Sequence, residues 1–179
     1  MNIDNINRVI AAVRAEPHHF VMEYWNTATN AAESFPEKKR LSLARNNPCN
    51  TAGCLGGWMD SLALCDIADG KMAAPVVSDE DLKDGIGSPL YLAARFIGMA
   101  ESEQGWGSGL DMLFHMDRHF SMIRFDRLPP KARAEAGARA LEIFRDNDGR
   151  SNWTRALEET GLLGYMEGGE VAIDGQTYR

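Results

Sequence analysis

The sequence has no long hydrophobic run. No stretch approaches the roughly 20 consecutive apolar residues that a helix needs to span a bilayer. The amino terminus, MNIDNINRVIAAVRAEP, has acidic and amide residues where a signal peptide carries basic ones. We therefore predict no membrane association and a cytoplasmic location.

Basic residues and cysteines are also scarce. The chain has 19 Lys and Arg against 26 Asp and Glu, which gives a net charge of −7. Because contacts to the phosphate backbone dominate affinity for nucleic acids, this balance argues against direct binding to them. The three cysteines are an odd number and do not imply a disulfide framework. There is no internal repeat and no low-complexity segment.

The composition is that of an ordinary globular protein. Of 179 residues, 44% are hydrophobic and 25% are charged, which is enough apolar material for one good core. We predict that residues 1–179 form a single domain. Residues 166–179 are interpreted as either a hairpin or a flexible tail.

Start and stop signals predict a mainly α fold. The amino-terminal helix is expected to be capped by Asp4 or Asn5 and to end near Ala15, before Pro17. The central helix is expected from Thr51 to Ile67, followed by a stop at Gly70, and is apolar on all sides, which predicts that it is buried. Further helices are expected over 89–97, 110–116, 130–145 and from Asn152 to a stop at Gly161.

A small β-element is expected near the carboxyl terminus. Asp174-Gly175 lies between two short runs, Val171–Ile173 and Gln176–Tyr178. An Asp-Gly pair between such runs is typical of a tight hairpin turn.

Cys54 is the strongest candidate for a nucleophile. At the start of a helix, the helix dipole and backbone donors would lower the pKa of a thiol. A cysteine hydrolase or transferase also needs a basic histidine, and His115 and His119 follow in the chain. The competing interpretation is structural: Gly53 and Gly57 let a neighbouring backbone approach closely, and a buried cysteine behaves as a small hydrophobe. We favour the structural interpretation, so the chain is predicted to be non-enzymatic.

The metal-binding alternatives are weaker. Asp111, His115 and His119 would share one face of a continuous helix, and first-row metals accept such ligands. A polar helix face explains the same spacing, and the sequence lacks the His-Glu-x-x-His zinc motif. We predict neither a metal nor a cofactor.

Two features are candidates for contact with a partner protein. The first is an acidic segment containing Asp79, Glu80, Asp81 and Asp84, since acids steer a protein towards basic surfaces. The second is Trp106, which lies in a glycine-rich stretch and could anchor a contact. A nucleic-acid-binding protein with a basic groove would suit the acidic segment.

The chain resembles a group of small proteins from phages and from bacteria that carry prophages. The resemblance rests on a Cys-x-Thr-x-x-Cys-x-x-Gly-Trp motif, and it spans most of residues 5–160. In this chain the motif consists of Cys49, Thr51, Cys54, Gly57 and Trp58. The resemblance transfers no catalytic residue. It implies a phage-type accessory protein that binds a host or phage protein, one form of which is an anti-CRISPR-like inhibitor of a bacterial defence system.

Overall fold

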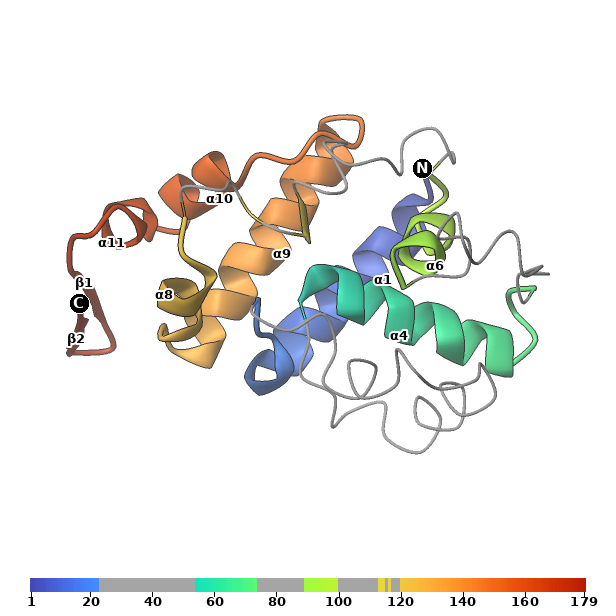
Figure 1. The fold of residues 1–179 in the computed structure, drawn as a ribbon, viewed down its shortest axis with the longest axis horizontal. Coiled ribbons are helices and arrows are strands. Elements are labelled where there is room, and N and C mark those ends of the chain that lie inside the picture. Colours follow the sequence, from blue (N-terminus) through green and yellow to red (C-terminus); the bar gives the residue numbers. More distant parts are fainter. Residues whose placement is uncertain (23–53, 74–88, 100–112, 115, 117–119) are drawn as a thin grey trace.

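A computed structural model describes residues 1–22, 54–73, 89–99, 113, 114, 116 and 120–179, and the structural statements below concern these residues. Figure 1 shows helices packed side by side and a small hairpin near the carboxyl terminus. The predicted mainly α fold with a small β-element is therefore confirmed.

Helix α1 spans Ile3–Ala15, and its predicted end before Pro17 is confirmed. The predicted cap was wrong, because the side chain of Asn2 accepts the hydrogen bond from the backbone N–H of Asn5 (3.1 Å). The chain then turns through a short 3₁₀ helix, η1 (Pro17–His19), and buries Phe20 completely.

Helix α4 spans Leu55–Ala68 and is buried on several sides, as its apolar pattern predicted. It begins later than expected: Cys54 occupies the N-cap position, and Thr51 lies outside the described residues. Helix α6 (Pro89–Phe96) packs along α4, and α4 also contacts α1. The predicted stop at Gly70 (φ +70°) is confirmed by its left-handed backbone, and Gly98 (φ +67°) follows α6 with the same backbone conformation.

Helix α9 (Pro130–Asp146) lies between α1 and α10 (Trp153–Glu159), as Figure 1 shows. Its buried side is rich in alanine, and Gly137 leaves room there for the ring of Phe20. The small side chains on this face allow α1, η1 and α10 to approach α9 closely. Asn152 caps α10 as predicted, by accepting from the backbone N–H of Arg155 (2.9 Å).

Two short helices, which the sequence analysis did not predict, complete the carboxyl-terminal half. They are α8 (Met122–Asp126) and α11 (Leu163–Met166). The Arg124 side chain joins them, donating to the carbonyls of Tyr165 (2.7 Å) and Gly169 (2.6 Å). Four- and five-residue helices are too short to show a period. A local signal exists only at the start of α8, where the side chain of Ser121 accepts from the backbone N–H of Arg124 (3.2 Å).

The carboxyl-terminal hairpin is confirmed. Strands β1 (Val171–Ile173) and β2 (Gln176–Tyr178) pair antiparallel, with Ala172 opposite Thr177. Asp174 (φ +50°) and Gly175 (φ +79°) both have positive φ, as a type I′ turn requires. Of the two interpretations of residues 166–179, the hairpin is therefore the one observed.

An ion pair fixes α1 against the end of α4. Arg8 donates two hydrogen bonds to the carboxylate of Asp66, at 2.7 and 2.9 Å, and Asp66 is buried. The hydrogen bonds from Arg8 lower the pKa of Asp66 below its ordinary value of 3.8. The folded state therefore favours the ionised carboxylate.

This ion pair predicts an acid-dependent loss of stability. At about pH 7 we expect Asp66→Asn to lower the free energy of unfolding by about 1–3 kcal/mol, because the charged hydrogen bonds are weakened. A lowered folded pKa contributes stability above the unfolded pKa and loses it as the pH falls through the folded pKa. The difference between wild type and Asp66→Asn should therefore shrink below about pH 4 in urea titrations. The exposed Glu167→Gln is the control, and a difference independent of pH would contradict the prediction.

No helix in the described ranges is long and apolar enough to cross a membrane.

Candidate binding cleft

An open cleft of about 660 Å³ lies between the first turns of α9, the end of α10 and strand β1. The lining residues fall in three segments: 129–139, 159–162 and 171–174. A volume of this size is in the range of small-molecule and peptide sites, about 300–1,000 Å³. The cleft is therefore the candidate functional site of the described residues.

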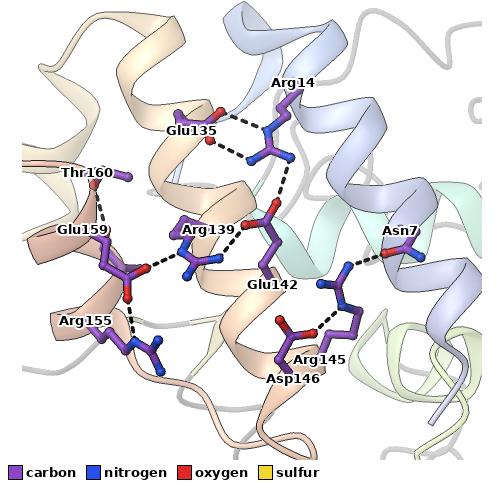
Figure 2. Close-up of polar contacts among 11 residues, drawn as sticks. Asn7, Arg14, Glu135, Arg139, Glu142, Arg145, Asp146, Arg155, Glu159 and Thr160 are labelled. Atoms are coloured by element: carbon purple, nitrogen blue, oxygen red, sulfur yellow. Dashed lines mark hydrogen bonds and ion pairs between the residues drawn. The ribbon is translucent and has the colours of Figure 1, made fainter.

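One wall of the cleft belongs to an arginine–glutamate network that joins three helices (Figure 2). Arg14 of α1 donates to both carboxylate oxygens of Glu135, at 2.7 and 2.9 Å, and lies 2.8 Å from Glu142. Arg139 also donates to Glu142 (2.8 Å) and donates to Glu159 of α10. The network thus links α1, α9 and α10 through alternating charges.

Arg155 extends the network by pairing with Glu159 at 2.7 Å. The six members are three arginines and three glutamates, so the network is electrically neutral. They are Arg14, Arg139, Arg155, Glu135, Glu142 and Glu159. An exposed single pair stabilises a fold by only about 0–1 kcal/mol, but a connected set also fixes the relative positions of the helices that carry it.

The titration of the glutamates follows from these contacts. Burial raises the pKa of Glu142, but hydrogen bonds from Arg139 and Arg14 outweigh it and hold the pKa below its ordinary value. Hydrogen bonds from Arg139, and then from Arg155, lower the pKa of Glu159. Neither Glu142 nor Glu159 is therefore suited to donate a proton near neutral pH.

The charges that remain available in the cleft are Lys131 and Asp174. Both side chains are exposed, and neither makes a hydrogen bond or ion pair with another described residue. Glu135, Arg139 and Glu159 also line the cleft, but each is held in the network. A bound molecule would therefore encounter one free cation at the start of α9 and one free anion at the hairpin turn.

Arg124 and Arg133 hold the parts of the cleft in place. The guanidinium of Arg124 lies 4.2 Å from the ring centre of Tyr165, and the Tyr165 hydroxyl donates to the Arg124 carbonyl (2.9 Å). These contacts anchor the segment that leads into the hairpin. Buried Arg133 donates to the carbonyls of Asp126 (2.5 Å) and Leu128 (3.3 Å), which fixes the turn between α8 and α9.

Most of the predicted site residues lie outside the described residues. This applies to the predicted partner contacts Asp79, Glu80, Asp81, Asp84 and Trp106, and to Asp111, His115 and His119. These assignments stay predictions. In the described ranges, no three His, Cys, Asp or Glu side chains form a group that could hold a metal ion.

Cys54, the candidate nucleophile, is described and is buried, with 3% of its surface exposed. Burial raises the pKa of its thiol to about 11, although backbone N–H groups of Gly57 and Gly56 act in the opposite direction. A thiol with this pKa is protonated at neutral pH and is a poor nucleophile. These properties favour the structural interpretation of Cys54.

Alkylation kinetics test this interpretation. We expect iodoacetamide to modify Cys54 in the folded protein at least about tenfold more slowly than half-exposed Cys65, because a buried protonated thiol reacts only on opening. Tryptic peptides measured by mass spectrometry over time give both rates from one sample, and both should become equal in urea. Faster labelling of Cys54 than of Cys65 would restore the hypothesis of a nucleophilic cysteine.

The cleft itself was not predicted from the sequence. Local signals for part of the network exist, because Arg139–Glu142 and Arg155–Glu159 have the helical spacings i,i+3 and i,i+4. The contacts of Arg14 with Glu135 and Glu142 join residues more than a hundred positions apart. No sequence pattern marks such a pair.

The fold and cleft define a mainly helical protein with an open site near a small carboxyl-terminal hairpin. Comparisons with protein-family models, curated proteins and solved structures gave no match.

Proposed function

We propose that this chain is a non-enzymatic, phage-type accessory protein that acts in the cytoplasm by binding a host or phage protein. An inhibitor of a bacterial defence system is the form of this function that we put forward. The partner is a protein with a basic surface, such as a nucleic-acid-binding protein. The single observation that carries the proposal is how the charges are distributed.

The described residues carry almost no net charge, and most of their arginines are bound to carboxylates or backbone carbonyls. They contain 13 Lys and Arg against 15 Asp and Glu, a net charge of −2. Six arginines pair with carboxylates, and two others donate to backbone carbonyls; they are Arg8, Arg14, Arg139, Arg145, Arg155 and Arg179, and Arg124 and Arg133. Little basic surface is left for a phosphate backbone, which supports a protein partner over a nucleic acid.

The remaining residues carry a net charge of −5, which is most of the −7 of the whole chain. Four of their acids are the predicted contact residues Asp79, Glu80, Asp81 and Asp84. An excess of one sign gathered in few segments steers association with a surface of the opposite sign. Cys54, with its buried thiol, supports the non-enzymatic part of the proposal.

The experiment is affinity capture with matched charge variants. In the test variant Asp79, Glu80, Asp81 and Asp84 are replaced by their amides. In the control variant the same number of exposed acids outside any ion pair is replaced: Glu16, Asp148, Glu158 and Glu167. We expect wild type and control to retain the same captured protein and the test variant to lose it.

The salt dependence of the association rate is then measured with the purified chain and the purified captured protein. The association rate of wild type should fall with ionic strength, and the test variant should show a weaker dependence. Failure of wild type to retain any protein under low-salt conditions would contradict the proposal. The alternative function, a cysteine hydrolase or transferase with Cys54 as nucleophile, requires the fast alkylation of Cys54 described above.

A further inference from the structure

Strand β1 lies along the cleft and leaves one edge unpaired by described residues. The cleft touches Val171, Ala172, Ile173 and Asp174 in sequence but no residue of β2. Successive side chains of a strand point to opposite faces, so a cleft that follows consecutive residues runs along the strand's edge. It therefore lies on the side of β1 that faces away from β2.

The register of the hairpin identifies which backbone groups face that side. Ile173 and Gln176 flank the two-residue turn and form a hydrogen-bonded pair, so the next pair, Ala172 with Thr177, is of the non-hydrogen-bonded kind. In such a pair the N–H and C=O point away from the partner strand. Ala172 thus directs one donor and one acceptor towards the cleft, and no other described residue bonds to them.

The start of α9 gives the same cleft a positive end. The carbonyl of Pro129 accepts from the N–H of Arg133 (3.1 Å), but Pro129 has no side-chain acceptor to cap the helix. The N–H groups of Lys131 and Ala132 have no acceptor within the helix and none among the other described residues. The exposed side chain of Lys131 lines the same cleft, so charge complementarity at this end favours a carboxylate.

We propose that the cleft binds the extended carboxyl-terminal residues of a partner protein, which add as a strand to the free edge of β1 and place their terminal carboxylate at Lys131 and the first turn of α9. This inference rests on the proposed function as a binding protein and assigns the site of one contact. A terminal carboxylate lies on the backbone, in the plane of the added strand, whereas side-chain carboxylates stand away from that plane. The cleft follows four consecutive residues, Val171 to Asp174. An added strand advances about 3.3 Å per residue, as β1 does, so the cleft matches an extended peptide of about four residues.

The probe for the test is a library of random heptapeptides displayed with free carboxyl termini. Selected sequences are synthesised as the acid and as the carboxyl-terminal amide, and fluorescence anisotropy gives both Kd values with wild-type protein. We expect the acid to bind at least about tenfold more tightly than the amide, because the amide loses the charge that Lys131 recognises. A selection without binders, or equal Kd values, would overturn the proposal.

Two matched pairs of variants locate the site. Ala172→Pro removes the outward N–H of β1 without removing a bond of the hairpin, and Thr177→Pro does the same on the opposite edge. Lys131→Gln removes the free cation, and Arg150→Gln removes an exposed cation at the far end of α9. We expect Ala172→Pro and Lys131→Gln to weaken peptide binding about tenfold or more, and the two controls to leave it unchanged.

The contrast between acid and amide uses wild-type protein, so it remains decisive if a proline variant disturbs the hairpin. Equal losses of peptide affinity in Ala172→Pro and Thr177→Pro would overturn the assignment of the peptide site to β1, provided that the resonances of Tyr178 show an intact hairpin. Self-association that disappears in Ala172→Pro would show that a second copy occupies the edge, which also overturns it.

The failure of this inference is distinguishable from failure of the proposed function. If affinity capture succeeds but no peptide is selected, the chain is a binding protein that uses another surface. If peptides bind β1 but no protein is captured, the cleft assignment stands and the proposed function is the part that fails.

Discussion

Replacing Gly137 by valine should lower the free energy of unfolding by about 3 kcal/mol, because the added side chain overlaps a buried aromatic ring. A Cβ at Gly137 would lie 2.6 Å from Cε1 of Phe20 and closer still to Cζ. Phe20 is fully buried, and in a close-packed interior its ring can move only by displacing its neighbours. For a chain of this length the melting temperature should fall by about 6–12 °C.

Urea unfolding monitored by circular dichroism measures the effect of Gly137→Val. The control is Gly164→Val, at the exposed position of α11, where an added Cβ meets nothing within 4 Å; its change should be within about 0.5 kcal/mol. In the background of Gly137→Val, Phe20→Ala should cost less than it does in wild type, by about 1 kcal/mol or more, because the two changes share one space. Additive losses would contradict the packing of Phe20 against Gly137.

Replacing Trp153 by alanine should cost about 3–5 kcal/mol, which is the other large effect we expect. Trp153 is 1% exposed, and its indole N–H donates to the carbonyl of Leu113 at 3.0 Å. Its ring meets Phe125 edge to face, with centres 5.9 Å apart, and Phe125 meets Phe20 in the same way at 6.2 Å. These three aromatic residues connect α10, α8 and the segment that follows η1.

A second substitution separates packing from hydrogen bonding. Trp153→Phe keeps much of the apolar contact but leaves the Leu113 carbonyl without its donor, so it should cost about 1–3 kcal/mol. The control, Ile123→Ala, truncates a side chain that is 57% exposed and should change stability by less than about 0.5 kcal/mol. Equal losses for Trp153→Ala and Ile123→Ala would show that the aromatic chain does not stabilise the fold.

The calcium-like sequence Asp146-Asn147-Asp148-Gly149 shows how a local pattern can suggest a function and yet only end a helix. Asp148 (φ +49°) and Gly149 (φ +80°) have the left-handed backbone that stops α9. Asp146 pairs with the guanidinium of Arg145 at 2.7 Å. The sequence already excluded the calcium loop, because Ser151 stands where glycine is needed.

The basic run between residues 124 and 145 shows the opposite case, in which tertiary structure changes the interpretation of a local pattern. Its six basic and three acidic residues are a pattern typical of a solvated helix face, but Arg133 is buried and donates to backbone carbonyls. Arg124 is bound to α11, and Arg139 is bound to α10. Charge counts cannot show which arginines form hydrogen bonds within the fold, because the acceptors come from distant segments or from the backbone.

The sequence by itself determined the features that depend on a few neighbouring residues. The carboxyl-terminal ends of α1 and α4, the cap of α10 at Asn152 and the hairpin turn at Asp174-Gly175 follow from backbone preferences and local hydrogen bonds. The mainly α class follows in turn, since such signals recur along the chain.

Only the tertiary structure decided what lies between these elements. The short helices α8 and α11, the pairing of Arg14 with Glu135, and the cleft beside β1 each require segments far apart in the sequence. Their stability comes from packing and charge contacts across those distances, and such contacts leave no period or spacing in a single sequence. The position of Cys54 is the clearest example: the same residue at a helix start would be reactive if exposed, and burial is the main cause that raises the pKa of its thiol to about 11.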